Sequence, residues 1–154
     1  RFPLPHQTMP PRPRYSVHPS LARMKGSAAD AEAYLREAPR YVEAMYATRP
    51  ALRPLHEALE ALAFSLGDDI RLCPGKTIVP VYRRHVIAQI KPATKTRIDF
   101  GLALGGLTGR GRLLETGGFA KQDRITHRIA VSSMDDMDQE FRDWLRKAYE
   151  GDAG

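Results

Sequence analysis

The residue pair that most clearly indicates a binding site is Arg97 and Asp99. The two residues are separated by one position in a segment where every second residue is apolar. Because the side chains of a strand alternate between its faces, both are expected on the face opposite Ile98 and Phe100. An arginine offers paired N–H donors to a phosphate or carboxylate, and a neighbouring aspartate can hold the guanidinium in place. The pair therefore indicates a binding site for an anion. The alternative is a solvated sheet face with an ion pair of small energetic value.

Further basic side chains are expected on the same sheet face or along its rim. The alternation places Gln89 and Lys91 on the polar side of the preceding strand, and Thr126 and Arg128 on that of the last strand. The candidate anion-binding residues are Lys76, Arg83, Arg84, Lys91, Lys95, Arg97, Asp99 and Arg128.

The positive charge of the chain lies in residues 1–29, which hold five Lys/Arg and no Asp/Glu, and in the middle of the chain. The net charge is +6 and the pI is near 9.7. Residues 67–131 hold twelve Lys/Arg against five Asp/Glu, whereas residues 132–154 hold three against seven. Such a field favours anionic partners such as nucleic acid, phosphates or acidic surfaces, although a modest positive charge also serves solubility alone.

The single cysteine, Cys73, excludes an internal disulfide and a CxxC redox pair. We expect it to be buried and inert, and its isolation fits a reducing cytoplasm. No apolar run approaches the roughly 18 residues of a membrane span, and the first residues hold no signal-peptide core. We therefore expect a cytoplasmic protein with no membrane partner.

The histidines and the glycine-rich loop indicate no further chemistry. His127 shares the parity of Ile129, which favours a buried histidine bonded to the backbone over an acid/base role. His56 and His85 lack a second ligand at metal spacing. Residues 105–112 are glycine-rich but lack the pattern of a phosphate-binding loop. The sequence thus predicts no catalytic residue, no metal and no cofactor.

The elements that must position these residues belong to one ordinary domain. The chain has 154 residues and is 42% hydrophobic and 27% charged, as in globular proteins. Six of the twelve prolines fall within the first nineteen residues, which predicts an extended arm anchored by Tyr15 and Val17. The expected segments are a Pro/Arg-rich arm over 1–24, a helical lead-in over 25–49, one α+β domain over 50–150 and a tail over 151–154.

Three helices are expected before the strands. Ser27 and Asp30 form a capping-box pattern that begins a helix over about 28–37, and Pro39 suits the first turn of a second short helix that ends at about Ala47. Gly67 is expected to end the third helix as a left-handed cap. The apolar stripe of that helix is Leu52, Leu55, Leu59, Leu62 and Leu66.

Residues after Gly67 change to a period of two, which predicts antiparallel strands. The expected strands are 70–73, 76–83, 85–91, 96–104 and 125–132, with a weaker one at 112–116. Pro80 indicates that its strand lies at a sheet edge or carries a bulge.

A closing helix should follow the strands. Ser133 and Asp136 repeat the capping box before a terminal helix that ends near Glu150. In this helix Phe141, Trp144 and Leu145 are expected to close the core. The fold class is therefore α+β, with N-terminal helices, an antiparallel meander of about five strands and a C-terminal helix.

Several short motifs carry a family resemblance. They are Cys73-Pro74-Gly75-Lys76-Thr77-Ile78-Val79-Pro80, Ile90-Lys91-Pro92, Lys95-Thr96-Arg97-Ile98-Asp99, Thr126-His127-Arg128 and Trp144-Leu145-Arg146-Lys147-Ala148-Tyr149. Over about residues 50–150 the chain resembles the bacterial family named domain of unknown function 5655. Members of that family recur as appendages of nuclease-like proteins or behind a helical module, domain of unknown function 4287. The resemblance implies a nucleic-acid context.

The opening of the chain departs from that pattern. Relatives with the helical module begin with an opening similar to residues 14–19 and reach a segment like Glu32-Ala33-Tyr34-Leu35 only after the module. Here the two are almost adjacent, so we expect the module to be missing and the chain to be broken near Met24/Lys25. Met9 is a candidate for the true first residue.

Three functions remain open. The first is a non-catalytic module that binds an anionic partner, nucleic acid or a phosphate-bearing ligand, through a basic sheet face. The second is an enzyme or small-molecule sensor with Asp99, Lys91, Arg97 and Tyr82 around a polar pocket at the sheet end. The third is a structural or interaction domain. The sequence indicates no oligomeric state.

Overall fold

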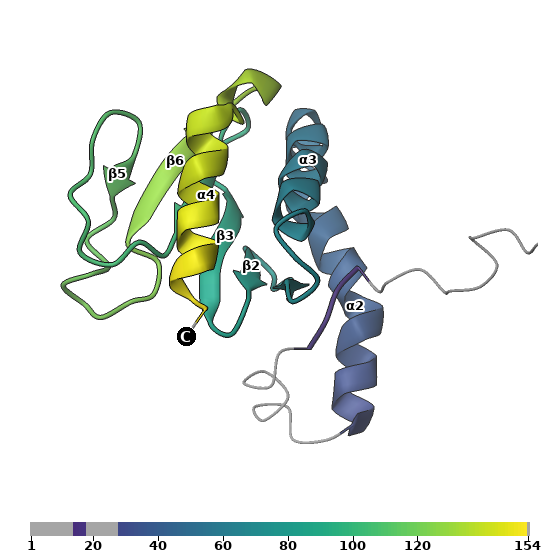
Figure 1. The fold of residues 1–154 in the computed structure, drawn as a ribbon. Coiled ribbons are helices and arrows are strands. Elements are labelled where there is room, and N and C mark those ends of the chain that lie inside the picture. The colour runs from purple at the N-terminus through teal and green to yellow at the C-terminus, as the bar shows by residue number, and fades with distance from the viewer. Residues whose placement is uncertain (1–13, 18–27, 154) are drawn as a thin grey trace, which may run out of the picture.

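A six-stranded antiparallel sheet forms the centre of the protein, and α4 lies across one of its faces (Figure 1). The structure, a computed structural model, describes residues 14–17 and 28–153. Its helices are α2 (Ala28–Tyr46), η2 (Pro50–Leu52), α3 (Arg53–Phe64), η3 (Met134–Asp136) and α4 (Gln139–Gly151). Its strands are β1 (Arg71–Leu72), β2 (Val79–Tyr82), β3 (Val86–Pro92), β4 (Ile98–Leu102), β5 (Leu114–Glu115) and β6 (His127–Val131). The predicted α+β class is confirmed.

The strand order is β1-β2-β3-β4-β6-β5, so the polar residues of three neighbouring strands share one face. In this register Gln89 is opposite Gly101, and Gly101 is opposite Arg128. Lys91 is opposite Asp99 in the next row. The alternation of side chains then directs the intervening apolar residues toward α4.

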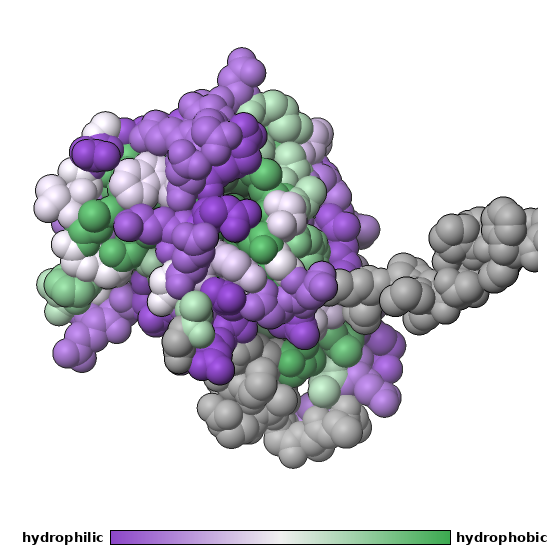
Figure 2. All heavy atoms as spheres, viewed as in Figure 1, coloured by the Kyte–Doolittle hydropathy of each residue, from purple (hydrophilic) through white to green (hydrophobic). Residues whose placement is uncertain are grey.

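The core lies between the sheet and the helices. The rings of Phe100 on β4 and Phe141 on α4 are both fully buried, with centroids 4.9 Å apart. In the view of Figure 2, hydrophilic side chains cover the outward side of α4, and apolar residues lie between α4 and α3. Trp144 is only partly buried against this core, so the expectation that it closes the core alongside Phe141 is only partly met.

The capping box of Ser133 and Asp136 is present, but it begins η3. The N-cap of α4 is Asp138, whose carboxylate accepts a hydrogen bond of 3.0 Å from the amide of Phe141. The short turn and the helix are therefore capped separately.

The expected boundary at Pro39 is wrong, because α2 is one continuous helix with Pro39 inside it. A proline in a helix interior removes one backbone hydrogen bond and crowds the preceding turn. Here the flanking Ala38 and Val42 are buried in the core, while Pro39 itself is exposed. Packing on the buried face carries the helix through the proline.

Gly67 does not act as the expected left-handed cap of α3. The helix ends at Phe64, and the amide of Ser65 closes its last turn on the carbonyl of Ala61 at 3.0 Å. The described glycines with positive φ are Gly105, Gly111 and Gly117, all in loops between β4 and β6. A Cβ at Gly67 would collide with Tyr149 Oη and lie 2.8 Å from Asp69 Oδ1, so a larger residue here would displace the ends of these two side chains.

Of the two explanations offered for Pro80, the edge position is wrong because β2 lies between β1 and β3, whereas the bulge is present. The outer neighbour β1 has only two residues, which pair with Val81 and Tyr82. The register with β3 shifts between Val81 and Tyr82, which marks the bulge.

Part of the N-terminal arm packs on the domain. Tyr15 is buried, and the amide of Ser16 donates a hydrogen bond of 2.9 Å to the carbonyl of Leu72 on β1. The predictions that concern Met9, Met24/Lys25 and the Ser27 cap lie outside the described residues. None of the helices within 28–153 is long and apolar enough to cross a membrane.

Candidate functional site

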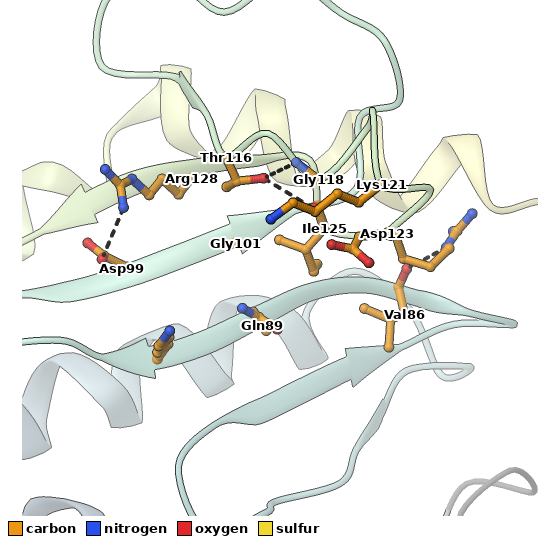
Figure 3. A pocket seen from close by; sticks show the side chains of 12 residues that line it. Val86, Gln89, Asp99, Gly101, Thr116, Gly118, Lys121, Asp123, Ile125 and Arg128 are labelled. Atoms are coloured by element: carbon orange, nitrogen blue, oxygen red, sulfur yellow. Dashed lines mark hydrogen bonds and ion pairs between the residues drawn. The ribbon is translucent and has the colours of Figure 1, made fainter.

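A pocket of about 510 Å³ lies on the sheet face turned away from α4 (Figure 3). Strands β3, β4 and β6 form its floor, and the loop between β5 and β6 forms a wall. Its lining residues are Val86, Gln89, Lys91, Asp99, Gly101, Thr116, Gly118, Lys121, Asp123, Arg124, Ile125 and Arg128. Four cations therefore meet two carboxylates, and the pocket carries an excess of positive charge.

Gly101 lies at the centre of the floor. A Cβ built there would lie 2.8 Å from the Cγ of Gln89 and 2.8 Å from the Cγ2 of Ile125. These two side chains converge over the glycine, so any larger residue would displace them. The floor depends on this one position having no side chain.

Asp99 is neutralised from two directions. Its Oδ1 accepts a hydrogen bond of 2.9 Å from Arg97 Nε, and its Oδ2 is 3.8 Å from Arg128 Nη1. Within 14–17 and 28–153, the side chain of Lys91 has no ion-pair partner, although Asp99 is its register partner. The positive charge of Lys91 is thus uncompensated beside the floor.

The loop wall adds two cations of different kinds. Arg124 donates a hydrogen bond of 3.2 Å to the carbonyl of Val86, and its Nη2 is 3.5 Å from Asp152 Oδ1. The side chain of Lys121 has no ion-pair partner in the described part of the chain. Arg124 is therefore held in place, while Lys121 is available to a ligand.

Close packing sets the path of this loop. The amide of Gly118 donates to Thr116 Oγ1 at 3.0 Å, and the amide of Asp123 donates to the carbonyl of Gly118 at 2.9 Å. A Cβ at Gly118 would collide with the carbonyl oxygen of Ile125. The loop approaches β6 closely because this residue is a glycine.

The structure gathers only part of the predicted anion-binding set. Lys91, Asp99 and Arg128 line the pocket, and Arg97 adjoins it through Asp99. Lys95 is exposed in the turn between β3 and β4. Lys76 lines a different pocket, between α2 and β2.

Arg83 and Arg84 lie apart from the pocket, in the turn between β2 and β3. Arg83 pairs with Asp69 at 2.8 Å, and its guanidinium carbon lies 3.9 Å from the centre of the Tyr149 ring. The backbone amide of Arg84 donates to Asp152 at 2.8 Å. This turn attaches the sheet to α4.

The four residues considered for an enzyme or sensor do not form one cluster. Asp99 and Lys91 line the pocket on the open sheet face, and Arg97 reaches it only through Asp99. Tyr82 instead lines the pocket that holds Lys76.

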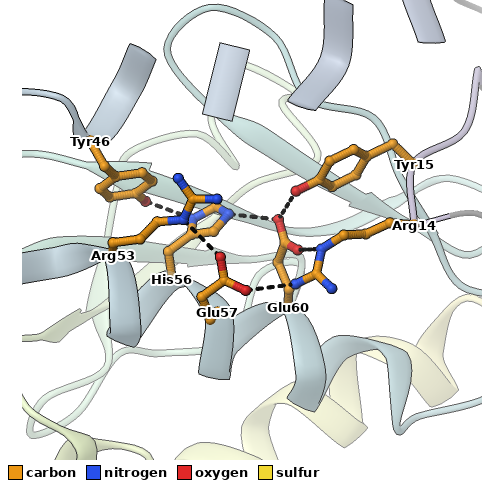
Figure 4. A network of polar contacts seen from close by, with 7 residues as sticks. All are labelled: Arg14, Tyr15, Tyr46, Arg53, His56, Glu57 and Glu60. Atoms are coloured by element: carbon orange, nitrogen blue, oxygen red, sulfur yellow. Dashed lines mark hydrogen bonds and ion pairs between the residues drawn. The ribbon is translucent and has the colours of Figure 1, made fainter. Parts of the chain in front are cut away.

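Reasoning from the sequence also missed a buried polar network around α3 (Figure 4). His56 and Glu60 are fully buried, and His56 Nε2 lies 2.6 Å from Glu60 Oε2. His56 Nδ1 lies 2.6 Å from Tyr46 Oη, while Glu60 also accepts from Tyr15 Oη at 2.8 Å and Arg14 Nε at 2.6 Å.

Burial alone would raise the pKa of Glu60, but the donors from His56, Tyr15 and Arg14 hold that pKa below its ordinary value. Burial raises the pKa of Tyr46. Because His56 and Glu60 are both inaccessible to solvent, the network serves to anchor the arm to α2 and α3.

Two other predictions from the sequence are confirmed. His127 is buried, and its Nε2 lies 2.7 Å from the carbonyl of Leu107. Cys73 is buried, as expected. Thr126 is buried as well, and its hydroxyl accepts a hydrogen bond of 3.0 Å from the amide of Leu104, so it does not contribute to the polar face.

The described residues contain no group of three or more His, Cys, Asp or Glu that could hold a metal ion.

Comparison with known proteins identifies the family. No curated protein and no solved structure matches the chain. The family model described as Domain of unknown function (DUF5655) matches residues 42–151. This range contains the whole sheet, α3 and α4, and therefore the pocket. Because the match spans well over half of the 154 residues, the chain belongs to the DUF5655 family.

Proposed function

We propose that this protein is a non-catalytic binding module that holds an anionic, phosphate-bearing ligand in the pocket on the open sheet face. The observation that carries the proposal is the position of Lys91 beside Asp99. One oxygen of Asp99 accepts a hydrogen bond of 2.9 Å from Arg97 and the other is 3.8 Å from Arg128, so Arg97, Arg128 and Lys91 share a single negative charge. A phosphate would supply the missing negative charge.

The surroundings of Lys91 favour a polyvalent anion over a chloride ion. Arg128 is half-exposed and only 3.8 Å from Asp99, so its guanidinium has donors left for a ligand. Lys121 adds a third cation from the loop wall. A concave wall with charges of one sign focuses the field on the ligand.

The shape of the pocket selects among anionic partners. A volume of about 510 Å³ lies within the range of small-molecule sites. The loop wall prevents a broad, flat contact with the sheet. A ligand of nucleotide size, free or as a unit of a strand, therefore fits better than a duplex lying across the face.

Binding to matched variants tests the proposal. The probes are inorganic phosphate, pyrophosphate and a fluorescent nucleoside monophosphate, titrated at low and at physiological salt. We expect Lys91→Ala and Arg128→Ala each to weaken binding about tenfold and to reduce its salt dependence. Lys76→Ala removes the same charge from a different pocket and should leave binding unchanged.

Two outcomes contradict this proposal. One is an absence of binding by the native protein to all three probes at low salt. The other is an equal loss in Lys76→Ala and Lys91→Ala, which would show that net charge rather than the pocket determines binding.

A further inference from the structure

A second pocket continues the first around the end of the sheet. It has a volume of about 530 Å³. Its lining residues are Ala103, Leu104, Gly105, Arg124, Lys147, Ala148, Glu150 and Gly151. Arg124 lines both pockets, so the two hollows meet at this side chain.

We infer that the ligand is a single-stranded nucleic acid that crosses both pockets, an inference that rests on the function proposed above. The basic side chains form a sequence along this path. Lys91 and Arg128 lie on the floor of the first pocket, Lys121 and Arg124 on the loop wall, and Lys147 on α4 beyond it. Consecutive phosphates of one strand would contact successive cations.

Arg124 is suited to lie between two nucleotides. Its hydrogen bond to the carbonyl of Val86 and its proximity to Asp152 fix the guanidinium. About half of the side chain is still exposed to solvent. A fixed, half-exposed guanidinium can bond a phosphate on one side and stack with a base on its planar face.

Phe119 supplies an aromatic surface on the same loop. It is 62% exposed, which is high for a phenylalanine. It follows Gly118, which lines the first pocket. A Cβ on Gly106 would lie 3.0 Å from the Cζ of Phe119, so the ring packs on Gly106. The preceding residue, Gly105, lines the second pocket. The ring lines neither pocket, but it lies beside Gly118 of the first pocket and packs on Gly106, which adjoins Gly105 of the second.

This combination distinguishes a single strand from other polyanions. An exposed aromatic ring beside a basic groove binds an unstacked base, and every base offers a π face. A duplex keeps its bases stacked inside, and an acidic peptide has no base to stack. Cations alone would accept any of these polyanions, so Phe119 is the residue that separates them.

The length of the ligand gives the first test. A thymidine monophosphate, a dinucleotide and longer oligothymidylates are titrated against the native protein by fluorescence anisotropy. We expect affinity to rise at least about tenfold from the monophosphate to the dinucleotide, because the second unit occupies the second pocket. Equal affinity for all lengths would overturn the inference.

Variants of the second pocket and of Phe119 give the second test. Phe119→Ala should lower affinity for the longer oligothymidylates about tenfold without changing phosphate binding, and Phe119→Trp should restore it. Lys147→Ala should lower the salt slope of oligonucleotide binding by about 0.7. Leu35→Ala removes an exposed apolar side chain from α2 and should change nothing.

The outcomes separate this inference from the proposed function. If Lys91→Ala abolishes phosphate binding but Phe119→Ala and Lys147→Ala are neutral with every oligonucleotide, the pocket binds one small anion and the single-strand inference is wrong. Equal binding of a duplex or of poly-glutamate also overturns it. If Lys91→Ala is neutral for phosphate, the proposed function itself fails.

Discussion

Asp152 accepts hydrogen bonds from both the backbone amide and the imidazole Nδ1 of His85, each at 2.7 Å. Its Oδ2 also accepts from the amide of Arg84 at 2.8 Å. Asp152 caps the C-terminus of α4, and His85 lies in the turn between β2 and β3. One nearly buried carboxylate therefore ties the last helix to the sheet and, at 3.5 Å, adjoins Arg124 of the pocket wall.

Asp152→Ala should destabilise the fold because it leaves two amides of the β2–β3 turn without their acceptor. We expect a loss of about 1–3 kcal/mol in the free energy of unfolding. Urea denaturation followed by circular dichroism measures it. Asp135→Ala, which removes an exposed carboxylate from η3, is the control and should change stability by less than about 0.5 kcal/mol.

The same carboxylate predicts a pH dependence. Burial would raise the pKa of Asp152, but the hydrogen bonds from His85 and Arg84 hold that pKa below its ordinary value. The contribution of Asp152 to the stability of the fold is therefore complete above the pKa that this aspartate has in the unfolded chain. It is lost as the pH falls through the lower pKa of the folded state. The stability curves of the native protein and Asp152→Asn should converge in acid. Stability curves that remain parallel as the pH falls through the lowered pKa of Asp152 would contradict the role assigned to this carboxylate.

Among the acidic residues of α2 and α3, Glu60 should be the one whose substitution lowers stability most. Glu60→Gln keeps the shape of the side chain but removes the charge that faces Arg14 and His56, so we expect a loss of about 3 kcal/mol. Glu57→Gln is the matched control. Glu57 pairs with Arg14 and Arg53 in solvent, and its loss should cost less than about 1 kcal/mol. If both variants lost a similar amount of unfolding free energy, the burial of Glu60 would not add to the stabilisation by its ion pairs.

The floor of the pocket could be predicted from the sequence because it depends on local alternation. Lys91, Asp99 and Arg128 fall on one face as soon as their strands pair antiparallel. The same rule could not exclude Arg83 and Arg84. They lie in a turn, where the position of the side chains depends on contacts with Tyr149 and Asp152 from the far end of the chain.

The loop wall and the buried network could not be predicted in the same way. Lys121 and Arg124 have no periodic pattern, and their loop follows the close approach of Gly118 to Ile125. The network did leave a signal. His56 and Glu60 are spaced at i and i+4 on the leucine face of α3, and two polar residues on an apolar stripe must find partners when buried.

Phe141→Ala and Trp144→Ala should differ in cost, although both residues belong to the predicted stripe of α4. Phe141 is fully buried against Phe100, so its truncation should cost about 3–5 kcal/mol. Trp144 is partly exposed, and its Nε1 donates to Glu140 at the surface at 3.3 Å, so we expect about 1–2 kcal/mol. Chemical denaturation of both variants checks this order. A loss as large for Trp144 as for Phe141 would place the indole in the core.

Gly101→Ala tests whether the pocket floor is as tight as its geometry indicates. The added methyl would lie 2.8 Å from side-chain carbons of Gln89 and Ile125, so one of them must move into the pocket. We expect a loss of about 1–2 kcal/mol in stability, together with weaker binding of phosphate-bearing probes. Gly75→Ala is the control, because the nearest atom to its Cβ is 3.6 Å away and it lines a different pocket. Native binding by Gly101→Ala would show that the ligand does not contact this floor and would move the binding site to the loop wall.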